Sequence, residues 1–432
     1  MDTTSAISTW TALIRQFFPV FTAPGTQIFL ALVTGWVLCT GRHTITGILP
    51  FADPEGQHAH DAFHRFLPHA HWDMNTLWKF LTILLVKTFA ASGVIELDLD
   101  DTLFHRCGRK VAGAGWWRDA VRSTRTQTVY AWGLNLVVLT LRVYPPWRGE
   151  PLGLPVLMRR HRKGGDSLID LAEAMLGQLG NWLPQRAFRL HADGFYATLA
   201  GRGLVRVHLI SRMRRDAKLY EPLAATRAQR RRGRPRTKGR RLLTPEKMAQ
   251  RVHSWQSVTT VERGHVRKRL VHPRPVLWYR VSKTPVLLVI SRDPTGKERD
   301  DFFFSTDLSL QPAQVIGGFA GRWSIEDTFK NTKQFIGGEE PQTWKGQGPE
   351  RAAMLSLWLS SAVWMWYLNE HDRWGNVRIL PWYPQKTHPS FQDALAHLRR
   401  HLWRQRIISM FGKRLGHDKK TEVLLEALAR AA

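Results

Sequence analysis

The order of elements between residues 91 and 213 limits this chain to one class of fold. Three strand-like runs rich in β-branched and aromatic residues come first: GVIELDLDD, TVYAWGLNLVVLTLRV and GLPVLMRRH. An amphipathic helix begins after the capping residues Asp166 and Ser167, followed by the strand AFRLHAD, a short helix and the strand LVRVHLISRM. This order predicts an α/β fold in which helices cover the faces of a sheet.

The charge of the chain indicates its partner. The 432 residues include 63 Lys and Arg against 35 Asp and Glu, a formal net charge of +28. Such an excess attracts polyanions, so we expect nucleic acid as the partner. Only two cysteines are present, which fits a reducing cytoplasm and leaves no cysteine-based zinc spacing. No signal-peptide pattern opens the sequence, and its longest apolar run, residues 352–368, is short for a membrane span.

The densest basic segment covers residues 227–241, RAQRRRGRPRTKGRR, and contains no acidic residue. Repulsion between like charges, together with Gly and Pro, favours a flexible arm over a packed element. Its GRPR core resembles an AT-hook, whose extended arginines fit a narrow minor groove, and the candidates for this role are Arg232, Arg234 and Arg236. The alternative is a solvated basic loop that contacts phosphates without sequence preference.

Three separated carboxylates occupy positions that suit phosphodiester chemistry. Asp100 and Asp193 each end an apolar strand-like run, and Glu326 lies in a helical pattern rich in basic residues. Two aspartates and a glutamate can hold a pair of divalent cations, which would activate an attacking oxygen and stabilise a leaving one. Asp98 shares the strand face of Asp100, whereas Asp101 lies on the opposite face.

The surroundings of Glu326 carry a second pattern. Each residue of an α-helix turns by about 100°. Phe319, Arg322, Glu326 and Lys333 therefore share one stripe, with the carboxylate between two cations and an aromatic ring one turn earlier. Arg and Lys beside a metal-binding Glu would suit a site for a DNA end. An ordinary Arg–Glu surface pair at four-residue spacing is the simpler alternative.

These four residues resemble the Y-(2)-R-(3)-E-(6)-K signature of bacterial insertion-sequence DDE transposases, with Phe319 in place of Tyr. The DDT sequence at 100–102 is similar to the first acidic motif of that family, and DGFY at 193–196 is similar to its second. The motifs come in the family's order, and the resemblance covers about residues 91–370. The alignment favours Asp100 as the first acid and leaves Asp98 as a supporting acid or a hydrogen-bond partner.

The resemblance implies an RNase H-like mixed sheet and two Mg²⁺ ions, replaceable by Mn²⁺, held by Asp100, Asp193 and Glu326. It also implies a DNA transposase of an insertion sequence, a metal-dependent endonuclease that binds terminal inverted repeats as a homodimer. Such an enzyme hydrolyses a phosphodiester at each element end and joins the freed 3′-hydroxyl to target DNA.

The resemblance also assigns DNA contacts. Arg322 and Lys333 would hold DNA near the cleaved bond, and Phe319 could stack although it lacks the tyrosine hydroxyl. The family often holds a flipped base on aromatic side chains. The candidates here are Trp116, Trp117, Trp132 and Trp323, for each of which a position in the core is the simpler interpretation.

We expect five segments along the chain. They are a helical N-terminal region for DNA binding or dimerisation (1–90), the first part of the core (91–213), a basic arm with a β-rich insertion (214–306), the remainder of the core with the helix of the third acid (307–370), and a basic helical C-terminal region (371–432).

Two other functions are compatible with parts of the sequence. DLDDTLF also resembles the nucleophile motif of haloacid-dehalogenase-type phosphatases, in which Asp98 would attack phosphorus and Asp100 would act as the acid/base. Its later Lys and paired Asp would have to be Lys297 and Asp300-Asp301, in a hydrophilic loop, and the large positive charge would have no purpose. The second alternative is a catalytically decayed DNA-binding relative that acts as a repressor, against which the presence of all three acids argues.

Overall fold

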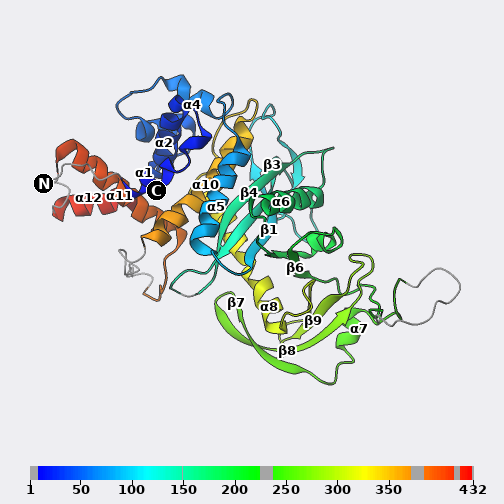
Figure 1. Cartoon of the computed structure of the whole chain (residues 1–432). Coiled ribbons are helices and arrows are strands. Elements are labelled where there is room, and N and C mark those ends of the chain that lie inside the picture. The colour runs from blue at the N-terminus through cyan, green and yellow to red at the C-terminus, as the bar shows by residue number, and fades with distance from the viewer. Residues whose placement is uncertain (1–7, 148, 224–236, 371–383, 413–418, 431–432) are drawn as a thin grey trace.

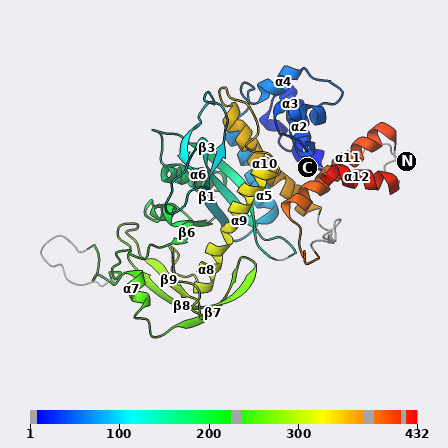
Figure 2. The same cartoon turned by 180° about the vertical axis from the view of Figure 1, so that it is seen from behind.

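A computed structural model describes residues 8–147, 149–223, 237–370, 384–412 and 419–430. Helices from both ends of the chain lie together at one end of the molecule, and the strands that follow residue 255 form the opposite end (Figures 1 and 2). The strands of residues 95–212 lie between these two regions and share one sheet with the later strands. The α/β fold class expected from the sequence is confirmed, and the sheet contains both parallel and antiparallel pairs.

Within the described residues the sheet has ten strands, in the order β2-β3-β1-β5-β6-β10-β9-β8-β7, with β4 paired to β3. Their bounds are β1 (Ile95–His105), β2 (Gly115–Arg118), β3 (Tyr130–Val143), β4 (Leu152–His161), β5 (Phe188–Ala192), β6 (Val207–Arg212), β7 (Gln256–Glu262), β8 (His265–Val276), β9 (Val286–Arg292) and β10 (Asp301–Ser305). The expected strands of the first core segment are all present, whereas β2 was not expected.

The helices before the sheet are α1 (Thr9–Arg15), η1 (Phe18–Val20), α2 (Ala23–Leu38), α3 (Ile45–Ala52), α4 (His60–Phe66) and α5 (Met74–Phe89). Those between strands are α6 (Leu168–Trp182), η2 (Gly194–Gly201) and α7 (Pro245–Ala249). Those after the last strand are α8 (Pro312–Gly321), α9 (Trp323–Gln334), α10 (Gly348–Asn369), α11 (Phe391–Phe411) and α12 (Lys419–Arg430). None of the helices described offers a stretch that is both long and apolar enough to cross a membrane.

Helix α6 leads the chain back to the middle of the sheet, where β5 pairs with β1. Strand β1 pairs antiparallel with β3 and parallel with β5, which pairs parallel with β6. A parallel pair needs a crossover, and α6 supplies it, starting at the predicted cap Ser167 in a capping box with Asp170. The carboxyl end of β5 therefore lies beside the middle of β1, which continues beyond this pairing to His105.

The β-rich insertion continues the sheet of the core. Strand β10 pairs antiparallel with β6, and β9, β8 and β7 follow in antiparallel order. The turn between β7 and β8 contains Arg263 and Gly264, both with positive φ. Residues 275–281, PVLWYRV, do not form a strand of their own, because β8 ends at Val276 and the amides of Val281 and Ser282 donate back to the carbonyl oxygen of Trp278.

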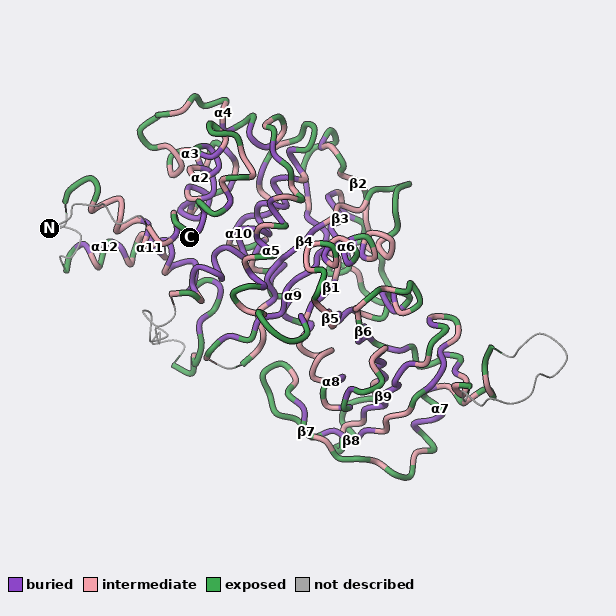
Figure 3. The backbone as a smooth tube through the Cα atoms, in the orientation of Figure 1, coloured by how far each residue is buried: buried purple, intermediate pink, exposed green. Residues whose placement is uncertain are grey.

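One hydrophobic core joins the N-terminal helices, the sheet and the C-terminal helices. Helix α10 is apolar and buried along almost its whole length, as expected for an interior helix (Figure 3). At its start the buried Arg351 donates to the carbonyl oxygens of Leu67, Ala70 and Trp72, at 3.0, 2.9 and 2.6 Å. These bonds fix the N-terminal helices to the helix that backs the sheet.

Candidate active site

Two of the three candidate acids lie on adjacent strands. Asp193 follows the last residue of β5, whereas Asp100 lies within β1, which continues to His105, so the expectation that Asp100 ends its strand is wrong. Leu99 of β1 pairs in parallel with Ala192 of β5, so Asp100 and Asp193 are the next residues on neighbouring strands, which lie about 4.8 Å apart. Asp193 caps η2, accepting a hydrogen bond from the amide of Phe195 at 2.9 Å, and the Ser211 hydroxyl of β6 donates to its carbonyl oxygen at 2.7 Å. The sheet thus fixes the backbone beneath both acids.

Helix α9 brings the third acid to the same strand. The Ser324 hydroxyl donates to Asp98 on β1 at 3.0 Å, and the Thr328 hydroxyl donates to the carbonyl oxygen of Gly153 on β4 at 2.6 Å. These contacts orient the first turns of α9 across the sheet. Glu326, between them in sequence, is thereby held beside β1, with its side chain about one-third exposed.

Arg322 joins two of the candidate acids directly. Its Nη1 lies 2.5 Å from Oδ2 of Asp100, and its Nη2 lies 3.0 Å from Oε1 of Glu326. The guanidinium is largely buried and therefore acts as a cationic bridge between β1 and α9. Asp193 is near enough to Asp100 to act on its ionisation. The structure therefore brings the three acids expected from the sequence into one region.

The ionisation of the acids in this region is governed first by burial. Burial raises the pKa of Asp100 to about 7; Arg322 opposes this shift, while Asp101 and Asp193 add to it. Burial likewise raises the pKa of Glu326, again opposed by Arg322. The pKa of Asp101 is also raised by burial, although the Tyr196 hydroxyl donates to it at 3.2 Å. Further positive charge at this point would favour the ionised carboxylates.

The chemistry of the donor set fits hard divalent cations, which prefer carboxylate oxygens. As placed, however, no three His, Cys, Asp or Glu side chains in the described part of the chain form a ready metal cluster. Arg322 contacts one oxygen of Asp100 and one oxygen of Glu326, so a divalent cation held by these acids would share them with the guanidinium or replace it.

The residues expected to flank Glu326 lie on two helices, so the expectation of one continuous helix is wrong. Helix α8 ends at Gly321 and α9 begins at Trp323, with Arg322 between them. Phe319 lies on α8, its ring 5.0 Å from that of Phe303 and 5.6 Å from the Arg322 guanidinium.

Lys333 lies about two helical turns after Glu326 on α9 and also contacts β1. Its Nζ donates to the carbonyl oxygen of Leu103 at 2.7 Å and lies 3.7 Å from Glu339. Burial lowers the pKa of Lys333. Arg322 and Lys333 therefore both contact β1, and Glu326 is linked to it through Arg322, although the ammonium of Lys333 already has protein partners.

Asp98 belongs to a buried ion-pair network. It is fully buried, and Arg142 of β3 donates to both of its carboxylate oxygens. Arg142 also approaches Glu96, whose other oxygen accepts from Arg189 at 2.9 Å. The expectation of a hydrogen-bonding role for Asp98 is thus met, but sequence reasoning missed Arg142. A lone Arg inside the apolar run TVYAWGLNLVVLTLRV was the available signal, because a buried cation requires a carboxylate.

The surroundings of Asp98 do not suit the phosphatase alternative. A nucleophilic aspartate must reach a substrate, whereas Asp98 has no exposed surface and is occupied by Arg142 and Ser324. Asp300 and Asp301 pair with Arg292 and Arg212 in the insertion and its border with the core.

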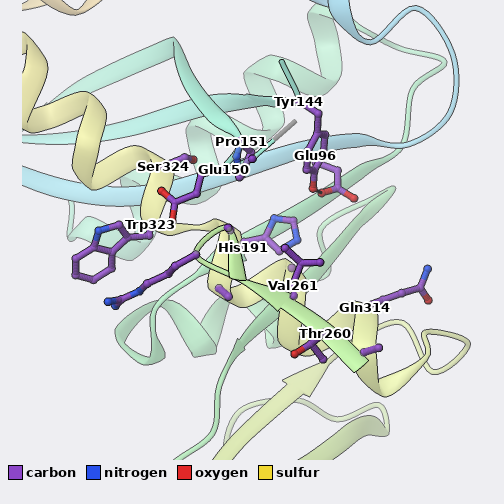
Figure 4. A pocket seen from close by; sticks show the side chains of 18 of the residues that line it. Glu96, Tyr144, Glu150, Pro151, His191, Thr260, Val261, Gln314, Trp323 and Ser324 are labelled. Atoms are coloured by element: carbon purple, nitrogen blue, oxygen red, sulfur yellow. Dashed lines mark hydrogen bonds between the residues drawn. The ribbon is translucent and has the colours of Figure 1, made fainter. Parts of the chain in front are cut away.

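A cavity of about 360 Å³ separates this network from the insertion (Figure 4). Its walls come from β1, β5, the β7–β8 hairpin and the α8–α9 junction, and His191 lies among them (Figure 4). The His191 Nδ1 lies 3.0 Å from the carbonyl oxygen of Leu97, so it carries the proton, and the buried Nε2 has no partner among the described residues. Trp323 lines the same cavity under the Arg263 guanidinium, 4.1 Å from its ring centre.

The simpler interpretation, which placed the candidate tryptophans in the core, is wrong. Trp116 is 57% exposed and Trp323 is 38% exposed. Trp117 and Trp132 are half-buried, and Trp132 donates through its indole to the carbonyl oxygen of Gly108 at 3.1 Å. The arginines of the basic arm, Arg232, Arg234 and Arg236, lie outside the described residues.

His191 gives a prediction about stability. Burial holds its pKa well below the ordinary value of 6.5. Below pH 6.5 the unfolded chain takes up a proton that the folded chain refuses, so stability should fall as the pH decreases. We expect the substitution His191→Asn, which keeps a donor towards Leu97, to reduce this fall by up to about 1.4 kcal/mol per pH unit. Urea unfolding of both proteins between pH 7.5 and 5 measures it, and equal pH dependence would contradict it.

Comparison with known proteins agrees with this geometry. Residues 16–284, well over half of the chain, match the family model described as DDE superfamily endonuclease. The match includes Asp100 and Asp193 and ends before Glu326, whose place beside them comes from the contacts of α9. No curated protein matches the chain. The residues matched and the mixed α/β sheet agree, and the chain therefore belongs to the DDE superfamily endonucleases.

Proposed function

We propose that this chain is the DNA transposase of a bacterial insertion sequence and acts in the cytoplasm on chromosomal DNA. The observation that carries the proposal is the Arg322 bridge between Asp100 and Glu326, next to Asp193 at the end of the adjacent strand. The family membership supports phosphodiester cleavage, and the net charge of +28 supports DNA as the substrate.

In this proposal Asp100, Asp193 and Glu326 hold two Mg²⁺ ions, or Mn²⁺ in their place. Bound divalent cations would lower the pKa of the attacking water and stabilise charge on the leaving oxygen. During hydrolysis the water oxygen bonds to phosphorus, the bond from phosphorus to the 3′ oxygen breaks, and the proton lost by the water balances the one gained by the new 3′-hydroxyl. In strand transfer the oxygen of that hydroxyl bonds to a phosphorus of the target DNA, the bond from this phosphorus to the 3′ oxygen of the target strand breaks, and the released 3′ oxygen takes up the proton that the attacking hydroxyl loses.

The flanking residues have roles in positioning DNA. When Arg322 releases a carboxylate, its guanidinium becomes available to a phosphate while Phe319 still packs below it. Lys333 adds a cation further along β1. The cavity beside Trp323 and Arg263 offers a flat wall on which an unstacked base could lie. Two element ends require two sets of acids, so we propose a homodimer on DNA.

A nicking assay tests the proposal. Purified protein is incubated with a supercoiled plasmid that carries the inverted repeats flanking the coding region, with Mg²⁺, Mn²⁺ or EDTA. We expect nicks at the repeat ends with either metal and none with EDTA. Binding to the repeats without nicking in either metal would instead favour the decayed repressor, and the absence of both would reject the proposal.

The basic arm provides a separate prediction. Each phosphate contact that is lost lowers the slope of log affinity against log salt by about 0.9. Replacing the arginines between residues 230 and 236 by Gln should therefore flatten the salt dependence of binding to a DNA duplex. Fluorescence anisotropy between 50 and 300 mM salt, roughly the range in which such slopes are measured, gives the comparison. An unchanged slope would show that the arm does not contact DNA.

A further inference from the structure

A second cavity, of about 490 Å³, opens just beyond the end of β1. Its walls come from the α2–α3 loop, from residues 106–111 that follow β1, and from residues 339–344 that follow α9. The last two segments are joined by a hydrogen bond from the amide of Ala112 to the carbonyl oxygen of Trp344, at 2.8 Å. We call this cavity the basic cleft, because four cations line it: Arg42, Arg106, Arg109 and Lys110.

The exposed cations of the basic cleft lack protein counter-ions. Arg42, Arg109 and Lys110 are exposed, and none of them has an ion-pair partner within the described residues. The two acids of the cleft are engaged elsewhere. Glu339 contacts His105 at 2.9 Å and Lys333 at 3.7 Å, and Glu340 contacts His43 at 2.9 Å. The cleft therefore presents excess positive charge to whatever enters it.

Arg106 supplies a buried cation to the cleft. It is 7% exposed, and its guanidinium donates to the carbonyl oxygens of His105 and Gly338 at 3.2 and 3.1 Å, with no carboxylate in contact. Its Nε has no partner among the described residues. Burial lowers the pKa of Arg106 to about 10, which leaves it charged at neutral pH. A buried guanidinium without a carboxylate is costly unless an anion completes its environment.

The position of the cleft relates it to the candidate acids. Arg106 comes six residues after Asp100, directly after the end of β1. In an extended strand this separation places the two residues about 20 Å apart. Lys333 lies between them, bonded to the carbonyl oxygen of Leu103. Successive base pairs are about 3.4 Å apart, so 20 Å corresponds to roughly six base pairs of duplex DNA.

We propose that the basic cleft binds backbone phosphates of the DNA about six base pairs from the bond cleaved at Asp100, Asp193 and Glu326. The proposal rests on the proposed transposase function. The cleft then acts as a second anchor, which holds the axis of the duplex along β1 while the acids act on one phosphodiester. Contacts to phosphate fix the register of the duplex without reading its sequence.

The chain contains a natural reporter at this place. Cys107 lines the cleft and is exposed, whereas Cys39, the other cysteine of the chain, is buried. The reaction of the folded protein with a thiol reagent such as DTNB therefore reports Cys107. We expect a 30-base-pair duplex to slow this reaction until its rate equals that of the protein molecules that remain without DNA. Inorganic phosphate at the same ionic strength should give little protection if the ligand is DNA, and full protection would assign the cleft to a free anion instead.

Matched variants test the charges themselves. The substitutions Arg109→Gln and Lys110→Gln together should lower the salt slope of duplex binding by about 1.8 and abolish the protection of Cys107. The control is Lys79→Gln with Lys87→Gln, which removes the same charge from exposed positions on α5. Equal slopes for the two double variants, or an unprotected Cys107 on DNA-bound wild-type protein, would overturn the basic cleft while leaving the proposed function standing. A wild-type protein that binds no duplex at all would overturn both.

Discussion

The substitution Asp193→Asn is expected to abolish strand cleavage while binding to the element ends persists. The amide keeps the size of the carboxylate and an oxygen that can accept from the amide of Phe195, so η2 should remain capped. It removes the charge that the proposed cations require next to Asp100. We expect the rate of nicking to fall by roughly 10²–10³-fold or more, as when a principal electrostatic contact to the transition state is lost.

Single-turnover nicking of the repeat-bearing plasmid measures this effect, and a mobility shift with the same repeats measures binding. The substitution Asp166→Asn is the control, because Asp166 is exposed and lies before α6, away from the acids. Glu326→Gln should behave like Asp193→Asn, since Gln can still accept from Arg322. Cleavage that survives either substitution would remove that residue from the proposed site.

The second large effect concerns folding. The substitution Arg142→Met leaves Asp98 buried without its cation, and breaking a buried pair in this way typically costs about 3–5 kcal/mol. We expect a loss of this size in the free energy of unfolding, measured by urea denaturation. The double substitution Asp98→Asn with Arg142→Met should recover part of it, because the unpaired charge is then absent.

A surface pair provides the control for this prediction. Arg214 and Asp216 form an exposed pair at 2.8 Å, and Arg214→Met should leave the unfolding curve unchanged. If Arg142→Met behaves like this control, Asp98 does not depend on Arg142, and the network cannot be what orients Ser324 and the start of α9.

The parts of the site that depend on local patterns were predictable from the sequence. The apolar runs before Asp100 and Asp193 are strands, and parallel pairing of these runs places the two acids on neighbouring strands, although β1 continues past Asp100 to His105. The helical spacing around Glu326 predicted that Arg322 and Lys333 lie on the same side as the acid, and both of these residues contact β1 although Arg322 lies outside α9. Each of these inferences uses the period of a single element.

The parts that depend on pairing between distant segments were not predictable. Arg142 meets Asp98 only because β3 folds back antiparallel on β1, and nothing local to either residue specifies that register. The break between α8 and α9 was not predictable either, because residues 319–333 have the spacing of a single helix. Gly321, the last residue of α8, lies so close to Arg142 that a Cβ there would be 2.9 Å from the guanidinium, and this contact also joins segments far apart in the sequence. Residues 275–281, PVLWYRV, have the composition of a strand and instead form a turn after β8, because apolar composition alone does not distinguish the two.

The direct pairing of β6 with β10 has a mechanical consequence. Ser211, whose hydroxyl holds the carbonyl oxygen of Asp193, lies on β6 opposite Phe304 of β10. A force on the β7–β8 hairpin is therefore transmitted through the hydrogen bonds of one continuous sheet to the loop of Asp193, because the paired strands connect the two directly. Tension in DNA bound to the hairpin would displace the backbone of that loop.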